Sequence, residues 1–247
     1  MNRRISDAAD LLAGAWRSNV RLASLPPAAQ PESLDDAHAI QLATAERLGE
    51  AIGGWKADIK RPIRAPVFGS RLFRSPARIP AKAMLRRLVE GEVAFVFDRP
   101  MPTAARDYTR EEVAAHVSAC VAIEVVDSRF QDQSTRPEFD RVADLLGNSA
   151  LVFGAPVSDW QHLDFATIHV SLTIDGRTIV DTAGGHGTGD PLSVCVMLVN
   201  GLRTSTGVAA GQVVTTGTYT GAPAMEVGST AVVRFAGLGS AEVTFTG

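Results

Sequence analysis

The stretch VEGEVAFVF at residues 89–97 is a run of apolar, largely β-branched and aromatic residues, which predicts a β-strand. Within it, Glu90 and Glu92 are two positions apart, so in a strand both side chains leave the same face. Two carboxylates on one face repel each other unless a cation or a proton relieves the repulsion. The stretch therefore predicts a sheet that carries a closely spaced acidic pair.

Similar strand-like runs follow, and most of them lie in the second half of the chain. Asp175-Gly176 between two runs is a strong two-residue hairpin signal, and Leu238-Gly239 is expected to turn a final hairpin. The runs are residues 120–128, 150–154, 166–174, 177–181, 212–218, 230–235 and 241–245. Strands and helices do not alternate regularly, so we expect the α+β class rather than a Rossmann or TIM arrangement. The expected architecture is a mixed, mostly antiparallel β roll or sandwich with peripheral helices.

The beginning of the chain has a helical texture. Residues 5–19 place apolar side chains on one helical face, and Ser33 can cap a second helix that we expect to end at Gly53-Gly54. We therefore predict an N-terminal helical segment over residues 1–54 and a catalytic β-rich domain over residues 55–247, together forming one structural unit.

Two further helices are expected between the strands. Thr109 and Glu112 have the spacing of a capping box. Asp190-Pro191 supplies an N-cap and a proline in the first turn, for a helix that we expect to stop near Gly207. Before it, His186 lies in a glycine-rich loop; we expect it to be exposed to solvent, with a position lining the site as the alternative.

Composition and charge exclude several classes of protein. The 247 residues are 45% hydrophobic and 21% charged, with a formal net charge of −3, which is an ordinary globular balance. We expect neither a nucleic-acid nor a membrane partner, because no basic face dominates and no apolar run of about 18 residues occurs. The basic run at residues 74–87 is expected to be solvated surface or a subunit contact. Cys120 and Cys195 fit reduced core thiols in a cytoplasmic protein, with one disulfide left open.

A third acidic residue, Glu124, lies between isoleucine and valine in a run that should be buried. Burying an unpaired carboxylate is costly, so Glu124 needs a partner, either a metal ion or an arginine such as Arg129. Three carboxylates suit Mg²⁺ or Mn²⁺, with water and substrate oxygens completing the coordination. Spacing alone leaves open that Glu90 and Glu92 mark a solvated strand face.

Three segments in a fixed order resemble the fumarylacetoacetate hydrolase superfamily: GWK (54–56), VEGEVAFVF and AIEVVDSRF (122–130). The resemblance continues through AGQVVTTGT (210–218) and is strongest to the branch of 2-keto-4-pentenoate hydratases and 4-oxalocrotonate decarboxylases. It covers nearly the whole chain and implies the fold of that family's C-terminal domain. It also implies that Glu90, Glu92 and Glu124 bind Mg²⁺ or Mn²⁺.

The resemblance further assigns the substrate end of the site. The lysine of the family's G-x-K segment projects into the site, which implies that Lys56 is the catalytic acid/base or binds the substrate carboxylate. Phe68, Asp144 and Thr218 are expected to contact the substrate. The chain departs from the family at Val67, where an aspartate is usual, and at Leu145-Leu146-Gly147, where Asn-Ala-Ser is usual.

From this resemblance we expect a metal-dependent hydratase that acts on a short 2-hydroxydienoate or 2-oxo acid through a metal-chelated enolate. Decarboxylation of a 2-oxo acid and carbon–carbon hydrolysis of an acylpyruvate remain alternatives, since all three reactions use the same enolate. A catalytically weak structural partner of such an enzyme is a further alternative. We expect a homo-oligomer with a small-molecule 2-oxo acid substrate.

Overall fold

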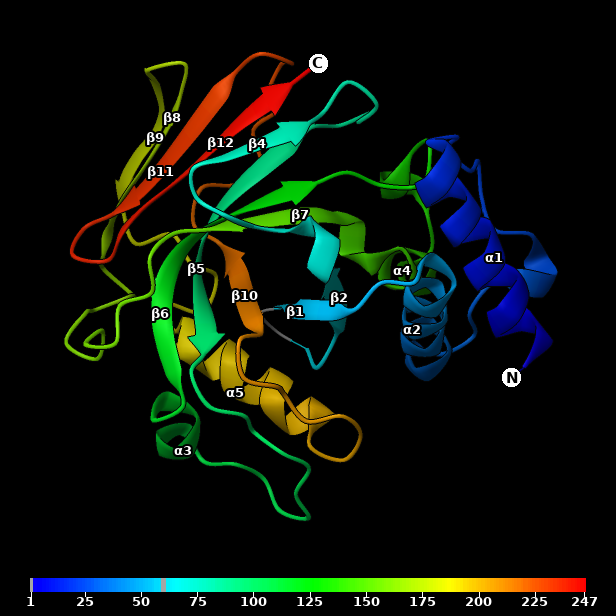
Figure 1. The fold of residues 1–247 in the computed structure, drawn as a ribbon, viewed down its shortest axis with the longest axis horizontal. Coiled ribbons are helices and arrows are strands. Elements are labelled where there is room, and N and C mark those ends of the chain that lie inside the picture. Colours follow the sequence, from blue (N-terminus) through cyan, green and yellow to red (C-terminus); the bar gives the residue numbers. More distant parts are fainter. Residues whose placement is uncertain (1, 59–60) are drawn as a thin grey trace.

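Two β-sheets form the centre of this computed structural model, which describes residues 2–58 and 61–247 (Figure 1). The first sheet, in spatial order, contains β2 (Arg64–Phe68), β1 (Ile52–Ala57), β10 (Val213–Thr218), β5 (Leu88–Phe97), β6 (Val117–Val126), β7 (Asn148–Phe153) and β3 (Leu72–Arg74). The second contains β4 (Ala77–Pro80), β12 (Gly239–Thr246), β11 (Thr230–Phe235), β8 (His169–Ile174) and β9 (Arg177–Ala183). Most neighbouring strands are antiparallel, whereas β1 with β10, β3 with β7 and β4 with β12 are parallel. The expected α+β class and mostly antiparallel β roll are therefore confirmed.

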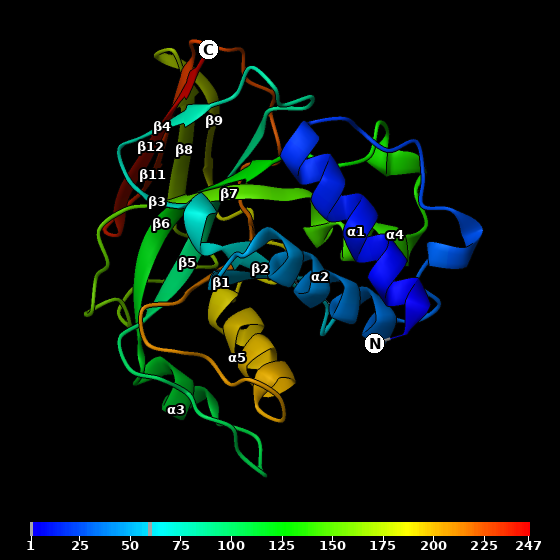
Figure 2. The ribbon, with the colours of Figure 1, turned by 45° about the vertical axis from the view of Figure 1, so that its right-hand side comes forward.

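The α-helices lie at the periphery of the sheets. They are α1 (Arg3–Ser18), α2 (Leu34–Leu48), α3 (Arg110–Ala114), α4 (Glu138–Ala143) and α5 (Pro191–Leu202). Both ribbon views place α1, α2 and α4 together at one end of the molecule, with α5 lying beneath the first sheet (Figures 1 and 2). Within residues 2–58 and 61–247, no helix combines the length and the apolar character needed to cross a membrane.

The second helix begins where the sequence predicts but ends earlier. The Ser33 hydroxyl accepts a hydrogen bond from the Asp36 amide at 3.1 Å, as expected for an N-cap. The helix ends at Leu48, because Gly49 adopts a left-handed conformation with φ +71°. The expectation that Gly53-Gly54 ends this helix is therefore wrong, since both glycines lie in β1. The first strand begins at Ile52, and the division into domains at residue 54 stays a prediction.

Gly54 is required where β1 runs parallel to β10. It pairs with Val213, and a Cβ atom at this position would lie against the Val213 carbonyl oxygen, closer than nonbonded atoms can approach. The absence of a side chain lets the two backbones meet, which in turn sets Lys56 opposite Thr215. This glycine therefore fixes the strand that carries the candidate catalytic lysine.

The local signals for the other helices and the hairpin are also present. Thr109 and Glu112 form both hydrogen bonds of the capping box at the start of α3. The Asp190 carboxylate caps α5, which ends at Leu202 rather than near Gly207. Asp175-Gly176 joins β8 to β9 with positive φ at both residues, as a type I′ hairpin turn requires.

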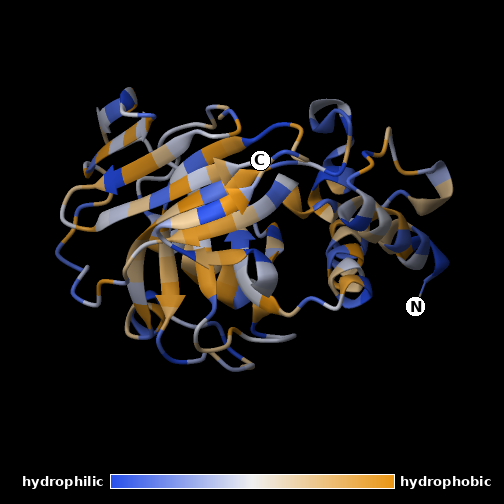
Figure 3. Cartoon of the chain, turned by 45° about the horizontal axis from the view of Figure 1, so that its top comes forward, coloured by the Kyte–Doolittle hydropathy of each residue, from blue (hydrophilic) through white to orange (hydrophobic). Residues whose placement is uncertain are grey.

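The main hydrophobic core lies between the two sheets. On β5 the alternate residues Val93 and Phe95 enter this core together with Val233 and Phe235 of β11. Figure 3 shows the central strands coloured mainly as hydrophobic. Because strand side chains alternate between faces, the even-numbered residues of β5, including both glutamates, point away from this core. The core therefore sets which face of the first sheet carries the acidic groups.

We expect Gly54→Ala to destabilise the protein by about 3 kcal/mol, the upper end of the cost of overpacking, because backbone atoms cannot move aside as a flexible side chain can. Gly14→Ala in α1 is the matched control, because a Cβ there meets nothing within 4 Å. It should stabilise by about 0.5–1 kcal/mol through helix propensity. Urea unfolding of both variants measures the difference, and equal stability of the two would contradict the close-approach argument.

Candidate metal centre

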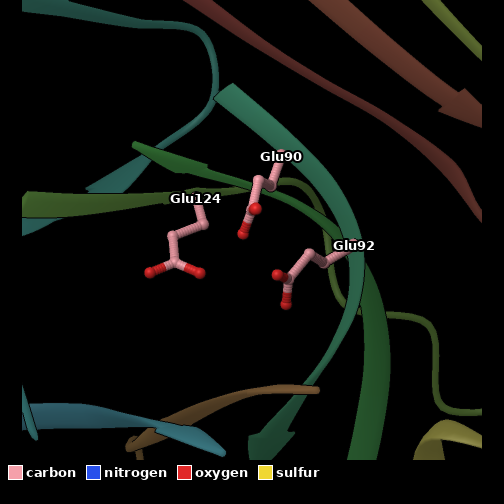
Figure 4. A group of neighbouring side chains, drawn as sticks. All are labelled: Glu90, Glu92 and Glu124. Carbon is pink, nitrogen blue, oxygen red and sulfur yellow. The ribbon is translucent and has the colours of Figure 1, made fainter. Parts of the chain in front are cut away.

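The three glutamates converge because β5 and β6 pair in an antiparallel ladder. Glu90 lies directly opposite Glu124, and Glu92 lies two residues further on the same face of β5. One carboxylate oxygen from each residue can be chosen so that all three lie within 4.8 Å of one another. Figure 4 shows the three side chains projecting from neighbouring strands into one space. The side chain of Glu124 is fully buried, whereas that of Glu90 is 19% exposed.

Lys56 is the cation of this cluster. Its Nζ lies 2.9 Å from Glu124 Oε2 and 4.0 Å from Glu90 Oε2. Arg129, the other partner considered for Glu124, instead forms a buried ion pair with Asp144. Lys56 reaches the glutamates from β1, which β10 separates from β5 in the sheet.

The protonation of the cluster reflects its burial and its excess of carboxylates. The pKa of Glu90 is raised to about 7, mainly because of burial; Lys56 opposes this rise and Glu124 adds to it. Burial, together with Glu124 and Glu90, raises the pKa of Glu92 to about 8. Burial opposes the charged form of Lys56, but the surrounding carboxylates outweigh this effect and hold its pKa above the ordinary value.

Fixed hydrogen-bond donors orient two of the glutamates. Glu92 Oε2 accepts hydrogen bonds from the Thr215 hydroxyl and, at 2.8 Å, from the Gly217 amide. Asn148 Nδ2 donates to Glu124 Oε1 at 2.9 Å. Sequence reasoning missed all three donors. The family-like segment at residues 210–218 was a signal for Thr215 and Gly217, but nothing in the sequence pointed to Asn148.

The donor set fits a hard divalent cation. Three carboxylates and one ammonium leave the cluster with a formal charge of −2 when every group is ionised. Glu124 Oε2, although close to Lys56, accepts no well-oriented hydrogen bond within residues 2–58 and 61–247. A buried oxygen with spare acceptor capacity and a net negative charge are both relieved by an oxygen-seeking cation such as Mg²⁺ or Mn²⁺.

The expected substrate contacts lie at different distances from this cluster. Thr218 is the strand partner of Glu92, and its hydroxyl donates to the Gly221 carbonyl. Phe68 is buried with Ala45 and Leu145 against the N-terminal helices. The substrate roles of Thr218 and Phe68 stay predictions, and the geometry favours Thr218.

Asp144 belongs to a buried network of hydrogen bonds and an ion pair next to the site. Its buried carboxylate accepts hydrogen bonds from the Ser128 hydroxyl, at 2.6 Å, and from the Arg129 amide, at 3.0 Å, and it pairs with the Arg129 guanidinium. Arg129 in turn donates to the Asn148 carbonyl at 2.9 Å. Asp144 therefore acts on Glu124 at a distance, through Arg129 and Asn148, and its direct contact with substrate stays a prediction.

His186 is buried, so the expectation of an exposed histidine is wrong. Its Nε2 lies 2.8 Å from the Thr216 carbonyl, and its ring packs against Tyr219 with 5.1 Å between ring centroids. The glycine-rich loop is thereby attached to the end of β10, next to the Gly217 amide that binds Glu92.

Comparison with known proteins gives consistent matches. A family model described as fumarylacetoacetate (FAA) hydrolase C-terminal matches residues 61–246. The chain is 30% identical to a 2-keto-4-pentenoate hydratase of Burkholderia vietnamiensis, over 76% of this chain and 71% of that protein. It is 26% identical to a 4-oxalocrotonate decarboxylase of Pseudomonas putida, over 77% and 74% of the two chains.

A solved structure shares the whole fold. The 4-oxalocrotonate decarboxylase from Pseudomonas putida G7, complexed with magnesium and adipate, superposes with a TM-score of 0.85 at 22% identity. The match covers 99% of this chain and 98% of that one. At this level of identity the likeness establishes the arrangement of the two sheets and the helices.

We expect the metal-free protein to lose stability between pH about 6.5 and 8 as the pH rises. Glu90 and Glu92 have folded-state pKa values of about 7 and about 8, above the value of about 4.3 for an unfolded glutamate. Their stabilising contribution is therefore complete at low pH and is lost as the pH passes through the folded values. The measurement is Tm against pH in the presence of a chelator.

Glu92→Gln is the control for this experiment and should flatten the decline. The window starts near pH 6.5 because of His38, whose pKa burial lowers to about 4. Between pH 4 and 6.5 the unfolded chain holds a proton on this histidine that the folded chain lacks, so stability rises with pH there. A wild-type Tm that does not fall across this pH window, and so behaves like the Tm of Glu92→Gln, would contradict the raised glutamate pKa values.

We expect Asp144→Ala to destabilise the protein by about 3–5 kcal/mol, because it leaves the buried Arg129 guanidinium without its counter-charge. Asp140→Ala in the preceding helix is the matched control, since one oxygen of that buried carboxylate has no hydrogen-bond partner among the described residues. Denaturant unfolding compares the two variants. A stable Asp144→Ala protein with impaired substrate binding would favour the substrate role instead.

Proposed function

The chain belongs to the fumarylacetoacetate hydrolase family, and on that premise we propose that it is a divalent-metal-dependent hydratase acting on a short 2-hydroxydienoate or 2-oxo acid. The observation that carries the proposal is the convergence of Glu90, Glu92 and Glu124 with Lys56 in one buried cluster. The relatives named as 2-keto-4-pentenoate hydratases support this class of substrate.

The three glutamates would hold Mg²⁺ or Mn²⁺. A divalent cation bound there would supply Lewis-acid stabilisation of the negative charge that develops on the substrate. The protein prepares for this by fixing Glu92 through Thr215 and Gly217 and by fixing Glu124 through Asn148. Ligands that are already oriented do not have to be ordered when the cation and substrate arrive.

We assign to Lys56 the binding of the substrate carboxylate and the transfer of a proton. Its ammonium lies within the acidic cluster on the strand next to β10, and its position is set by the close β1–β10 pairing. In hydration, a dienol becomes an unsaturated ketone when the C2 hydroxyl loses a proton and C5 gains one. The hydroxyl of water then adds at C4 and a proton at C3. Lys56, which carries a proton because its pKa is held above the ordinary value, is the proposed proton donor in these steps.

Two other reactions use the same groups. In decarboxylation of a 2-oxo dioate, the bond to the departing carboxylate breaks and its electron pair moves toward the C2 oxygen. In acylpyruvate hydrolysis, water attacks a carbonyl and a carbon–carbon bond breaks. A relative named 4-oxalocrotonate decarboxylase favours the first as the runner-up. The intact glutamates and Lys56 argue against a purely structural partner. A homo-oligomeric state and a cytoplasmic location stay predictions.

We expect Mn²⁺ to raise the Tm of the wild-type protein and Glu92→Gln to lose most of this increase, because the variant removes one negative ligand. Glu226→Gln is the matched control, since that side chain is 84% exposed and lies outside the cluster.

Lys56→Met should keep the Mn²⁺ effect and lose at least about a hundredfold in turnover, as expected for removal of an acid/base group. Thermal shift and kcat measure the two effects.

Substrate assays then separate the reactions. Loss of ultraviolet absorbance from 2-hydroxypenta-2,4-dienoate supports the hydratase, CO₂ release from 2-oxohex-3-enedioate the decarboxylase, and cleavage of an acylpyruvate the hydrolase. A protein whose Tm does not respond to Mn²⁺ or Mg²⁺ and that turns over none of these compounds would overturn the proposal and favour the structural partner.

A further inference from the structure

A bulge in β10 lies beside Glu92. Thr215 of β10 pairs with Ala94 of β5, and Thr218, three residues later, pairs with Glu92, which is only two residues from Ala94. The extra residue on β10 interrupts the ladder, so backbone groups of the bulge must find other partners. Gly217, within the bulge, has φ +111°, a conformation that residues with a side chain rarely adopt. The bulge therefore turns backbone groups out of the ladder next to a glutamate of the candidate metal centre.

The peptide group that joins Thr216 to Gly217 makes two hydrogen bonds in opposite directions. Its N–H donates to Glu92 Oε2 at 2.8 Å. Its C=O accepts a hydrogen bond from Nε2 of His186, also at 2.8 Å. The peptide group is trans and planar, so the two bonds leave opposite sides of one rigid unit. This single unit connects the imidazole of His186 to the carboxylate of Glu92.

The protonation state of His186 is set by its two partners. A carbonyl oxygen can only accept, so Nε2 carries a proton and donates it to Thr216. The Thr188 amide, 3.4 Å from Nδ1, donates to the other ring nitrogen. Burial lowers the pKa of His186 below its ordinary value, which favours the neutral ring that these two contacts require.

Packing holds the imidazole ring and the glycine-rich loop in place. The ring lies against Tyr219, with 5.1 Å between the ring centroids. Gly185, the preceding residue, has φ +117°, and a Cβ atom there would lie 2.7 Å from the Tyr219 carbonyl oxygen. The Tyr219 amide donates to the carbonyl of Gly91, between the two glutamates of β5. The loop is therefore attached to the chain on both sides of the bulge.

We propose that His186 is a positioning residue for Glu92, because it holds the Thr216–Gly217 peptide with its N–H directed at the carboxylate. The inference rests on the proposed function, in which Glu92 is one of three ligands of a divalent cation. Hydrogen bonds in a chain strengthen one another, so the bond from His186 also makes the Gly217 N–H a better donor. The Thr215 hydroxyl donates to the same carboxylate oxygen, so loss of His186 should loosen Glu92 without releasing it. We therefore expect an effect of about tenfold on metal affinity, the lower end for groups that orient a ligand.

Two substitutions separate the hydrogen bond from the packing of the ring. His186→Phe keeps a ring against Tyr219 and removes the donor, whereas His186→Gln removes the ring and can place an amide N–H near the position of Nε2. His162→Phe is the matched control, because the side chain of His162 is 62% exposed and lies outside the glutamate cluster. Calorimetric titration with Mn²⁺ should give a Kd about tenfold weaker for His186→Phe. The Kd of His186→Gln and of the control should stay close to that of the wild-type protein.

The metal-free protein allows a second measurement at the peptide group itself. Labelling threonine with ¹³C at the carbonyl and glycine with ¹⁵N selects the five Thr-Gly peptide groups of the chain in NMR spectra. Thr216→Ser removes one labelled threonine and keeps its hydroxyl, and so identifies the Gly217 signal. His186→Phe should speed hydrogen exchange of this amide roughly five- to tenfold, the effect of one lost hydrogen bond, and His186→Gln should not.

The outcomes separate this inference from the proposed function. Equal loss of Mn²⁺ affinity and equally fast amide exchange in both His186 variants would show that the ring acts by packing alone, and would overturn the inference. Wild-type affinity and wild-type exchange in His186→Phe would also overturn it.

If His186→Phe does not fold, the imidazole ¹⁵N shifts of the wild-type protein decide. A neutral ring with its proton on Nδ1 would overturn the inference, whereas a proton on Nε2 together with wild-type behaviour of His186→Gln would support it. Absence of Mn²⁺ binding by the wild-type protein would overturn the proposed function, and exchange of the Gly217 amide would still decide whether His186 holds the peptide.

Discussion

The repulsion between carboxylates on one sheet face is the constraint on which the rest of the structure depends. Antiparallel pairing sets Glu90 directly opposite Glu124, and like charges in that position destabilise a sheet. The hydrophobic core on the other face of β5 holds this register, because a slip by one residue would turn both of its glutamates into the core. The fold therefore stabilises an acidic cluster that Lys56 only partly neutralises.

A buried ion pair between Arg129 and Asp144 lies next to the cluster of glutamates and Lys56. Arg129 and Asp144 are both inaccessible to solvent, and Arg129 also holds the backbone of Asn148. Asn148 then reaches Glu124 with its amide group. A buried ion pair adds little net stability, but removing one partner is costly, so such a pair enforces one arrangement of the chain. Here that arrangement fixes Glu124, a carboxylate of the candidate metal centre.

One of the two segments that the resemblance marked as departures from the family, Leu145-Leu146-Gly147, lies between these two features. Leu145, Leu146 and Gly147 all have positive φ, which is unfavourable for leucine and persists because Leu145 is buried beside Phe68. Leu146 lines a cavity of about 330 Å³ together with Arg86 and Arg141, and the missing side chain of Gly147 leaves room for Gln133. The strained turn leads directly into Asn148, the donor to Glu124.

The sequence by itself determined what depends on near neighbours along the chain. The two-residue spacing of Glu90 and Glu92 predicted a shared face, and Ser33, Thr109 and Asp175-Gly176 predicted caps and a turn, because strand alternation and capping are local properties. The apolar run at residues 120–128 also predicted the strand of Glu124, and the family resemblance implied that Lys56 projects into the site. Only the tertiary structure decided that Lys56 rather than Arg129 neutralises Glu124, that Asn148 orients it, and that His186 is buried. These contacts join segments far apart in the chain, and their partners are set by sheet order and packing, which no local spacing encodes.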